Sequence, residues 1–202
     1  MKLYYLTGAC SLAAHIALYE SGLKFETAKV DRKNRVASDG LALDDVNPKG
    51  YVPVLRLDSG EVLTENVAVL QYIADRAPAA KLAPAAGTME RYRLIEWLAF
   101  INSEIHKTFS PLFSPVAPEE AKAYALANLT KRTDWLEKEF GARQFLLGDQ
   151  FTVADAYLFT ILNWYGMRSI DLARWPNLKN YYDRVGARPA TQTAMKTEGL
   201  LK

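Results

Sequence analysis

The first third of the chain alternates short apolar runs with stretches of helical periodicity. Residues 2–6 (KLYYL) form a compact apolar run that predicts a β-strand. From Leu12 to Leu23, apolar residues recur at intervals of three or four, which predicts a helix that ends near Gly22. Residues 25–30 (FETAKV) predict a second strand. Because such units cross over with a right-handed sense, we expect the two strands to be parallel.

The next stretch predicts a hairpin followed by a helix. Residues 31–47 are polar and irregular, so we expect a loop there with at most one short helix. In residues 52–65 (VPVLRLDSGEVLTE), two runs rich in Val and Leu flank the turn-forming residues 58–60, which predicts a β-hairpin. A helix is expected from about Glu65. The predicted order is therefore βαβαββα.

The remainder of the chain has a different periodicity. Residues 76–87 (RAPAAKLAPAAG) contain Pro78 and Pro84 and end in Gly87, and they interrupt all periodicity. After Thr88, apolar residues recur with a period near 3.6 and strand alternation is missing. We therefore expect an α+β protein of two domains: residues 1–80 as the mixed domain, 81–87 as the linker and 88–202 as an all-helical bundle.

Composition narrows the classes of function. The chain has 202 residues, half of them apolar, and its 25 basic residues nearly balance its 23 acidic ones. No strong field exists to attract nucleic acid or an anionic membrane, so small molecules or proteins are the expected partners. The apolar run at the start ends at Leu6, too early for an export signal, and residues 156–167 are too few to span a membrane. A single cysteine requires no oxidising compartment, so we expect the cytoplasm.

That single cysteine, Cys10, falls where the first strand gives way to the first helix. A helix N-terminus presents unpaired N–H groups and positive potential, which would stabilise an ionised thiol or a bound thiolate. Alternatively, Cys10 packs as a small apolar group. Both interpretations stay open at this point.

Two further stretches also allow both a functional and a structural interpretation. Pro53 follows Val52 at a strand start; a cis bond there would turn the backbone of Val52 toward a peptide-like ligand, whereas the simpler interpretation is an edge position. Glu65 lies where the hairpin becomes a helix, so the N–H groups of Asn66 and Val67 could bind a carboxylate and Glu65 an ammonium. Ordinary helix capping explains that stretch equally well.

The helical half contributes a polar stripe. Asn102, Ser103, His106, Lys107 and Ser110 recur at three- and four-residue intervals beside an apolar seam. A solvated face is the usual meaning of such a stripe, but it carries one of only two histidines. The other, at position 15, lies on an apolar helix face and is expected to be structural.

Other residues of the helical half are assigned to folding or left open. Trp164 and Met167 could line an apolar pocket or simply belong to the core. Thr152 and Asp155 form a capping pair at a helix start, so we assign them to folding. Two histidines and one cysteine make no zinc site, and no glycine-rich phosphate loop is present.

Together, these motifs resemble a known family. "TGACSL" at a helix start, "NPKGYVPVL", "LTENVAVLQYIAD" and "FTVADAYLF" occur in the order typical of cytosolic glutathione S-transferases. With cysteine at position 10, the chain is most similar to the bacterial beta class. The resemblance implies a thioredoxin-like first domain that binds glutathione as co-substrate, a helical domain that forms the pocket for an electrophile, a two-fold homodimer, and no prosthetic group or metal.

The resemblance also assigns roles. Cys10 and His106 match the catalytic pair beside the glutathione sulfur. The residues that it implies around glutathione are Tyr5, Ser11, Arg35, Tyr51, Val52, Pro53, Glu65, Asn66, Ser103 and Lys107, with Tyr5 secondary; those implied around the electrophile are Phe113, Trp164 and Met167.

Three departures from the family pattern matter. Asn66 replaces a common hydroxyl residue. Ala99 removes an amide that relatives can offer from the partner subunit. The basic residue for the glycine carboxylate could be Arg32, Lys33 or Arg35.

Three functions follow as alternatives. The first is conjugation, in which the activated glutathione thiolate attacks a small, mostly apolar electrophile. The second uses a mixed disulfide on Cys10 for thiol–disulfide exchange, peroxide reduction or reductive dehalogenation, with a second glutathione needed to resolve it. The third is a non-enzymatic binder of apolar ligands, since fold does not fix function.

Overall fold

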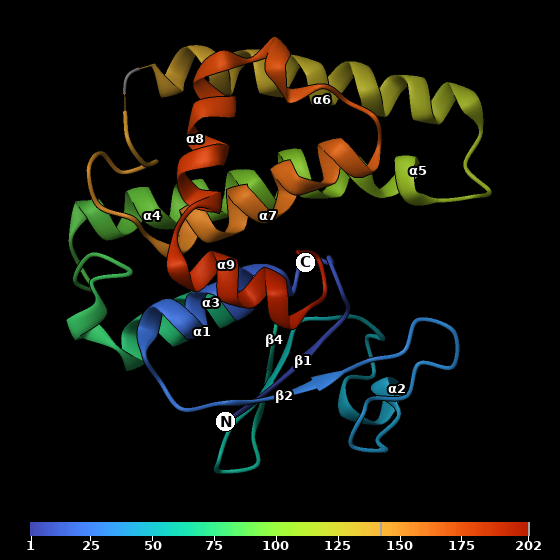
Figure 1. Cartoon of the computed structure of the whole chain (residues 1–202), viewed down its shortest axis with the longest axis vertical. Helices are drawn as coiled ribbons and strands as arrows, with labels where there is room; N and C mark the ends of the chain where they lie inside the picture. Colours follow the sequence, from blue (N-terminus) through green and yellow to red (C-terminus); the bar gives the residue numbers. More distant parts are fainter. Residues whose placement is uncertain (142, 202) are drawn as a thin grey trace.

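The predicted sheet forms in the first third of the chain, in a computed structural model that describes residues 1–141 and 143–201 (Figure 1). Its strand order is β2–β1–β3–β4. The central strand β1 runs parallel to β2 and antiparallel to β3, and β4 completes the hairpin with β3. The parallel pair and the hairpin are therefore confirmed. The strands are β1 Lys2–Tyr5, β2 Glu26–Lys29, β3 Val54–Arg56 and β4 Val62–Thr64.

The two faces of the sheet are covered by different elements. Helices α1 (Leu12–Ser21) and α3 (Asn66–Arg76) cover one face, while the short α2 (Leu43–Val46) lies on the other. Because side chains alternate along a strand, β1 contributes to both faces. Leu3 belongs to the large core with α1 and α3, whereas Tyr4 belongs to a small cluster with α2.

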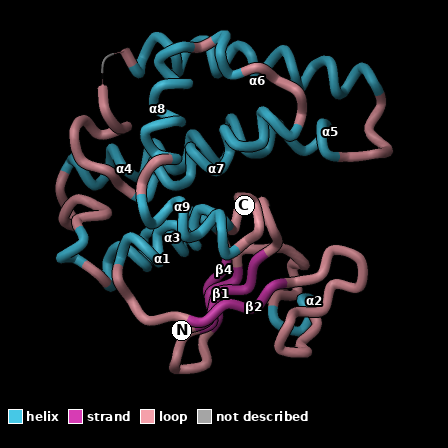
Figure 2. The backbone as a smooth tube through the Cα atoms, viewed as in Figure 1, coloured by secondary structure: helices cyan, strands magenta, loops and turns pink. Residues whose placement is uncertain are grey.

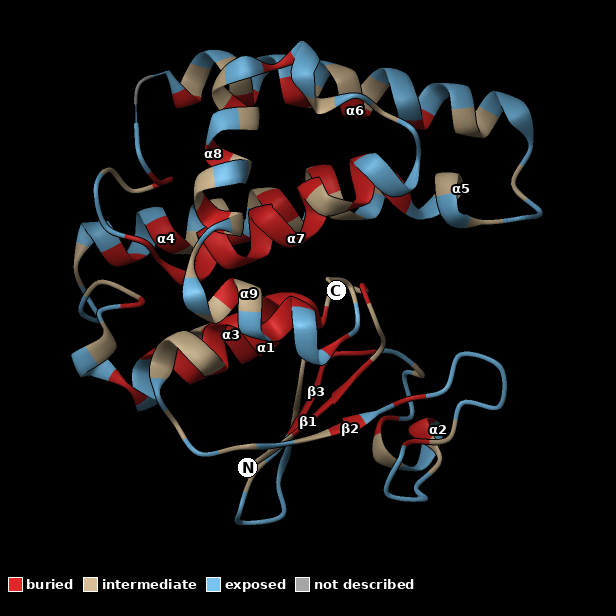
Figure 3. Cartoon of the chain, viewed as in Figure 1, coloured by how far each residue is buried: buried red, intermediate tan, exposed pale blue. Residues whose placement is uncertain are grey.

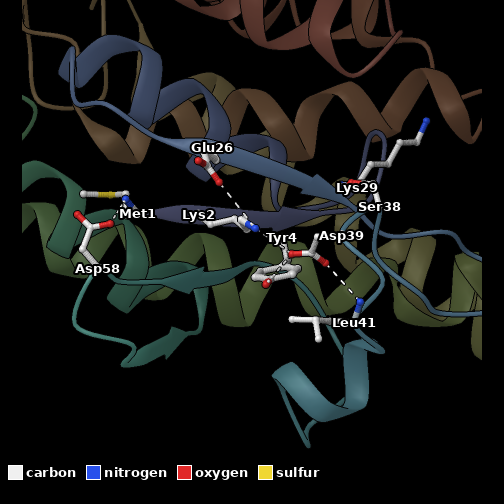
Figure 4. A network of polar contacts seen from close by, with 9 residues as sticks. All are labelled: Met1, Lys2, Tyr4, Glu26, Lys29, Ser38, Asp39, Leu41 and Asp58. Carbon is white, nitrogen blue, oxygen red and sulfur yellow. Dashed lines mark hydrogen bonds and ion pairs between the residues drawn. The ribbon is translucent and has the colours of Figure 1, made fainter.

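A polar network holds the loop before α2 against β1 (Figure 4). The hydroxyl of Tyr4 donates to Asp39 over 3.0 Å, and the Lys2 ammonium reaches the same carboxylate at 3.0 Å. At the strand start, the N-terminal ammonium is paired with Asp58 at 2.6 Å. The irregular segment predicted for residues 31–47 is therefore an ordered cover for the second face of the sheet.

The second half is helical, as predicted, and α7 lies at its centre with most of its side chains buried (Figure 3). Residues 81–87 hold neither helix nor strand and precede the first long helix of this half, so the domain boundaries stay a prediction that is compatible with the structure. The helices are η1 Pro78–Ala80, α4 Met89–Phe100, η2 Ile101–His106, η3 Lys107–Phe109, α5 Ser110–Phe113, α6 Glu119–Phe140, α7 Val153–Met167, η4 Leu172–Arg174, α8 Pro176–Gly186 and α9 Pro189–Thr197.

The helix that carries the polar stripe is less regular than its periodicity predicts. After α4, the chain continues as the π-helix η2, then as the 3₁₀-helix η3 and the short α5. A π-turn is wider than an α-turn and is found frequently at functional sites. Here the change of winding coincides with the residues of the stripe that the sequence singles out.

The two halves share one hydrophobic core. Helix α1 packs against α7 and α9, and α3 packs against α7. The C-terminal segment after α9 returns to the end of the sheet that lies far from the N-terminus (Figure 2). Among the described residues, no helix combines the length and the apolar character needed to cross a membrane.

Candidate active site

A cavity of about 190 Å³ lies where the two halves meet. The loop after β1, the start of β3 and the start of α3 form its wall on the sheet side, and η2 with α7 forms the opposite wall. Eight of its ten lining residues are ones that the family resemblance assigns to the site, and a ninth, Asn102, belongs to the polar stripe. The lining residues are Cys10, Tyr51, Val52, Pro53, Glu65, Asn66, Asn102, His106, Lys107 and Tyr157.

Cys10 lies just before Ser11, the N-cap residue of α1. Its thiol donates a hydrogen bond to the carbonyl oxygen of Val52 at 3.2 Å. Desolvation raises the pKa of the Cys10 thiol to about 12, and nearby N–H groups together with the Lys107 ammonium only partly oppose this. The interpretation in which the helix start ionises Cys10 is therefore corrected: the thiol is neutral and acts as a hydrogen-bond donor.

The backbone around Pro53 has the geometry considered from the sequence. The Val52–Pro53 peptide bond is cis. Val52 is buried, and its carbonyl oxygen is the acceptor for the thiol of Cys10. This brings the start of β3 directly against the candidate catalytic residue.

Glu65 is the N-cap residue of α3 and has a left-handed φ of 69°. Its Oε1 accepts hydrogen bonds from Lys49 at 2.8 Å and from the Tyr51 hydroxyl at 2.5 Å. The hydrogen bond from the Lys49 ammonium keeps the pKa of Glu65 below its usual value. Both donors use one oxygen, and no described residue donates to Oε2.

Asn66 connects α3 to the thiol loop. Its Nδ2 donates to the backbone carbonyl of Cys10 at 3.0 Å. Its Oδ1 is buried and has no hydrogen-bond partner among the residues that the structure describes. The amide therefore supports the loop with one end and offers an acceptor with the other.

His106 faces the cavity from η2. Its Nδ1 lies 2.6 Å from the hydroxyl oxygen of Tyr157 on α7, and that hydroxyl donates to Oδ1 of Asn102 at 3.0 Å. Burial, assisted by the Lys107 ammonium, lowers the pKa of His106 to about 4. His106 is therefore a neutral imidazole at neutral pH.

Sequence reasoning did not identify Tyr157 and Lys49 as site residues. Tyr157 belongs to the apolar positions that recur with a helical period over residues 153–164. Aromatic residues in such a pattern usually belong to the core, and Tyr157 is indeed fully buried. The available signal was its hydroxyl, which needs a partner inside an otherwise apolar helix. Asn102 was recognised in the polar stripe but was given no role.

Four predicted glutathione contacts lie outside the cavity lining. Tyr5 is in the core, with its ring 5.3 Å from that of His15. Ser11 is buried, and its hydroxyl bonds both backbone groups of Leu6. Arg35 is occupied by Asp44 at 2.7 Å and by the carbonyl of Gly50, while Ser103 is exposed. The single chain therefore lends these four assignments no geometric support, and any contact with glutathione stays a prediction.

Of the residues expected around the electrophile, Trp164 packs against His106 and Phe113 packs against Trp164, although none of the three expected residues lines this cavity. The Trp164 ring packs edge-on to His106 at 5.0 Å and to Phe113 at 5.2 Å. Trp164 is buried, and its Nε1 donates to the Gly8 carbonyl at 2.8 Å, so its polar tip has a structural role. Phe113 and Met167 are exposed.

Two further sequence interpretations can be compared with the structure. His15 is structural: it is buried, with Nδ1 3.0 Å from Glu198. Asp155 accepts from the N–H of Thr152 at 2.8 Å, which confirms a capping interaction at the start of α7. Within the described part of the chain, no group of three or more His, Cys, Asp and Glu residues could hold a metal ion.

The raised thiol pKa predicts slow alkylation of the native protein. At neutral pH, iodoacetamide should modify Cys10 about a hundredfold or more slowly than it modifies the denatured chain, because only the thiolate reacts. The rate of the native protein should continue to rise with pH beyond 9, the ordinary thiol value. Mass spectrometry measures it without ambiguity, since there is one cysteine. Equal rates for the native and denatured chains would contradict the assignment.

Comparison with known proteins identifies the family of the chain. The family models described as "Glutathione S-transferase, N-terminal domain" and "Glutathione S-transferase, C-terminal domain" match residues 7–76 and 100–189. Glutathione S-transferase GstA of Escherichia coli O157:H7 is 42% identical over 200 residues, which cover 99% of this chain and all of the relative.

Solved structures give the same result. A sphingomonad glutathione S-transferase complexed with glutathione is 49% identical, with a TM-score of 0.96 and full coverage of both chains. The bacterial beta class glutathione S-transferase of Sphingomonas chungbukensis has the same identity, TM-score and coverage. This chain therefore belongs to the glutathione S-transferase family.

Proposed function

We propose that the cavity around Cys10 binds glutathione and activates its thiol for attack on a small, mostly apolar electrophile. The observation that carries the proposal is the meeting of Cys10, Glu65 and His106 in one cavity, although they come from three separate elements. The carboxylate of Glu65 suits the ammonium at the γ-glutamyl end of glutathione, and the thiol of Cys10 and the imidazole of His106 suit the sulfur of its middle residue.

Glutathione recognition follows from the wall on the sheet side. Oε2 of Glu65 is available to the ammonium of the γ-glutamyl residue, whose carboxylate would accept from the first N–H groups of α3. The backbone of Val52, which lines the cavity, would pair with the peptide group of the middle residue in strand fashion. This orientation directs the cysteine of glutathione toward Cys10.

The reaction needs little covalent chemistry from the protein. The S–H bond of glutathione breaks, its electron pair stays on sulfur, and the proton leaves toward the side of His106. The sulfur then forms a C–S bond with the electrophile as the leaving group departs with its own electron pair. The neutral Cys10 thiol would donate a hydrogen bond to the thiolate, and the Lys107 ammonium would contribute positive potential.

The electrophile is expected beside His106, over Phe113, Trp164 and Met167. The Arg168 guanidinium lies 4.3 Å above the Phe113 ring, so one edge of this apolar surface carries a positive charge. Such a surface discriminates only weakly between electrophiles of similar shape and apolar character. Assignment to the beta class is supported by Cys10 and by the similarity to the Sphingomonas chungbukensis enzyme. We also propose that the protein is located in the cytoplasm, because a single cysteine requires no oxidising compartment.

Thiol transfer through a Cys10 mixed disulfide is the alternative function. Its support is that the only cysteine of the chain lines the cavity. The raised pKa of Cys10 disfavours it, because exchange begins with a thiolate and this thiol is neutral.

The variant Cys10→Ala separates the two functions. Conjugation of glutathione to 1-chloro-2,4-dinitrobenzene should persist in the variant within about tenfold of wild type, because one hydrogen bond to the thiolate is lost. Reduction of a glutathione mixed disulfide should disappear. Absence of conjugation in the wild type would overturn the proposed function, and equal loss of both activities would contradict the proposed role of Cys10.

Glu65→Gln tests the ammonium site. The neutral amide keeps the shape of Glu65 but loses the charge, so KM for glutathione should rise about tenfold to a hundredfold while KM for the electrophile stays the same. Steady-state kinetics with each substrate varied in turn measures both constants. The matched control is Glu61→Gln, which removes an exposed carboxylate from the hairpin. An unchanged KM for glutathione in Glu65→Gln would remove Glu65 from the site.

We also propose that the protein forms a two-fold homodimer, as the family resemblance implies. Ala99, the position from which relatives can offer an amide to the partner's site, is exposed on α4, and Ser103 is exposed on η2. Sedimentation equilibrium should give twice the chain mass of 22.6 kDa. A monomeric mass at micromolar concentration would contradict the dimer.

A further inference from the structure

Three polar side chains form a continuous hydrogen-bonded chain behind the cavity. Asn102 and His106 both come from the π-helix η2, and the hydroxyl of Tyr157 on α7 lies between them. The two distances are 2.6 Å from Tyr157 to Nδ1 of His106 and 3.0 Å from Tyr157 to Oδ1 of Asn102. All three line the cavity.

The direction of these hydrogen bonds follows from the atoms. Oδ1 of Asn102 can only accept, and a tyrosine hydroxyl has a single hydrogen, which Tyr157 therefore gives to Asn102. Toward His106, the Tyr157 oxygen is then an acceptor, so Nδ1 of His106 must carry the proton. In a neutral imidazole this leaves Nε2 with a lone pair.

The surroundings keep the ring in this position. The rings of Tyr157 and Trp164, both on α7, lie edge-on to the imidazole at 5.8 Å and 5.0 Å. Nε2 accepts no hydrogen bond from the described residues, and it is not among the enclosed atoms that lack a partner. It is therefore reachable from the cavity in which Cys10 lies.

We propose that Asn102 and Tyr157 are positioning residues that hold His106 as the Nδ1–H tautomer, so that its Nε2 receives the thiol proton of glutathione. The inference rests on the proposed function, because it names the base that this function requires. Neither residue touches the reacting sulfur; both act through His106.

The proton balance is simple. The S–H bond of glutathione breaks with its electron pair left on sulfur, and a new N–H bond forms at Nε2, which gives a thiolate beside an imidazolium. The imidazolium still donates through Nδ1 to Tyr157 and now donates through Nε2 to the thiolate. After the C–S bond has formed and the leaving group has departed, the imidazolium loses its proton to water and the neutral tautomer returns.

The charged and titratable groups around His106 agree with this cycle. Lys107 on the neighbouring turn disfavours a resting positive charge, whereas Glu65 at the start of α3 favours one. Cys10 and Tyr157 are neutral, because burial raises the pKa of each group. His106 therefore starts each cycle as an acceptor, and a positive charge on it becomes favourable once a thiolate lies beside it.

NMR of protein with ¹⁵N-labelled histidine tests the tautomer directly. The chain has only two histidines, so the spectrum is simple, and the buried His15 serves as an internal measure of folding. In the wild type, Nδ1 of His106 should carry the proton and Nε2 should not. Asn102→Leu removes the acceptor and frees the Tyr157 hydroxyl to donate to Nδ1, so the proton should move to Nε2.

Two further variants control the experiment. Asn102→Asp keeps an acceptor oxygen and should keep the Nδ1–H tautomer. Tyr182→Phe is the matched control, because it breaks another tyrosine–asparagine hydrogen bond, 2.9 Å from Tyr182 to Asn163, that lies outside the cavity lining. Its spectrum and its activity should equal those of the wild type.

Kinetics then shows whether the tautomer matters for the reaction. Asn102→Leu should lower kcat about tenfold to a hundredfold, with little change in KM for glutathione, whereas Asn102→Asp should restore most of kcat. The pH dependence of kcat should also change in Asn102→Leu and not in Tyr182→Phe. A purely structural role would lower the stability of the fold without selecting between Asp and Leu.

The outcomes separate this inference from the function on which it rests. A wild-type proton on Nε2, or the same tautomer in the wild type and in Asn102→Leu, overturns the inference even if conjugation is fast. Equal kcat values for the Leu and Asp variants do the same. A wild type with the predicted tautomer but no glutathione conjugation refutes the proposed function instead, since the spectrum is recorded without glutathione.

Discussion

The site depends on how the backbone of Gly8 is held. The indole of Trp164 donates to its carbonyl at 2.8 Å, and its N–H donates to Glu198 at 2.8 Å. The first partner comes from α7, and the second comes from the segment after α9. The loop that presents Cys10 is therefore fastened by the helical half of the chain, although it belongs to the sheet half. Because both bonds are buried or nearly so, losing either would leave an unpaired polar group inside the protein.

Desolvation affects the pKa values of Cys10 and His106 more than the neighbouring charges do. Burial makes both Cys10 and His106 neutral at neutral pH, one as a thiol and the other as an imidazole. Neither Cys10 nor His106 therefore carries a charge before substrate arrives. Glutathione brings the sulfur that becomes charged, and the hydrogen-bond donors that would stabilise it are already in place. This explains how a helix start can serve a bound thiolate without ionising its own cysteine.

The two walls of the cavity have different roles. Residues of the sheet side, above all Val52 and Glu65, offer backbone and carboxylate groups suited to a peptide-like substrate. Residues of η2 and α7 offer a hydrogen-bonded chain that ends at His106. Asn102 and His106 lie four residues apart on η2 and reach one hydroxyl, and Lys107 also lines the cavity. Binding and proton transfer are thus carried by different elements that meet only in the folded chain.

The sequence by itself determined the local structure and the family. Strand runs, helical spacing and the turn at residues 58–60 act over a few residues, so the βαβ unit, the hairpin and the helical half could be predicted. The resemblance supplied Cys10, Val52, Glu65 and His106. Only the tertiary structure decided that the Cys10 thiol is neutral, that Arg35 is occupied by Asp44, and that Tyr157 bonds His106 from 51 residues away. Desolvation and long-range hydrogen bonds depend on neighbours that no local pattern specifies.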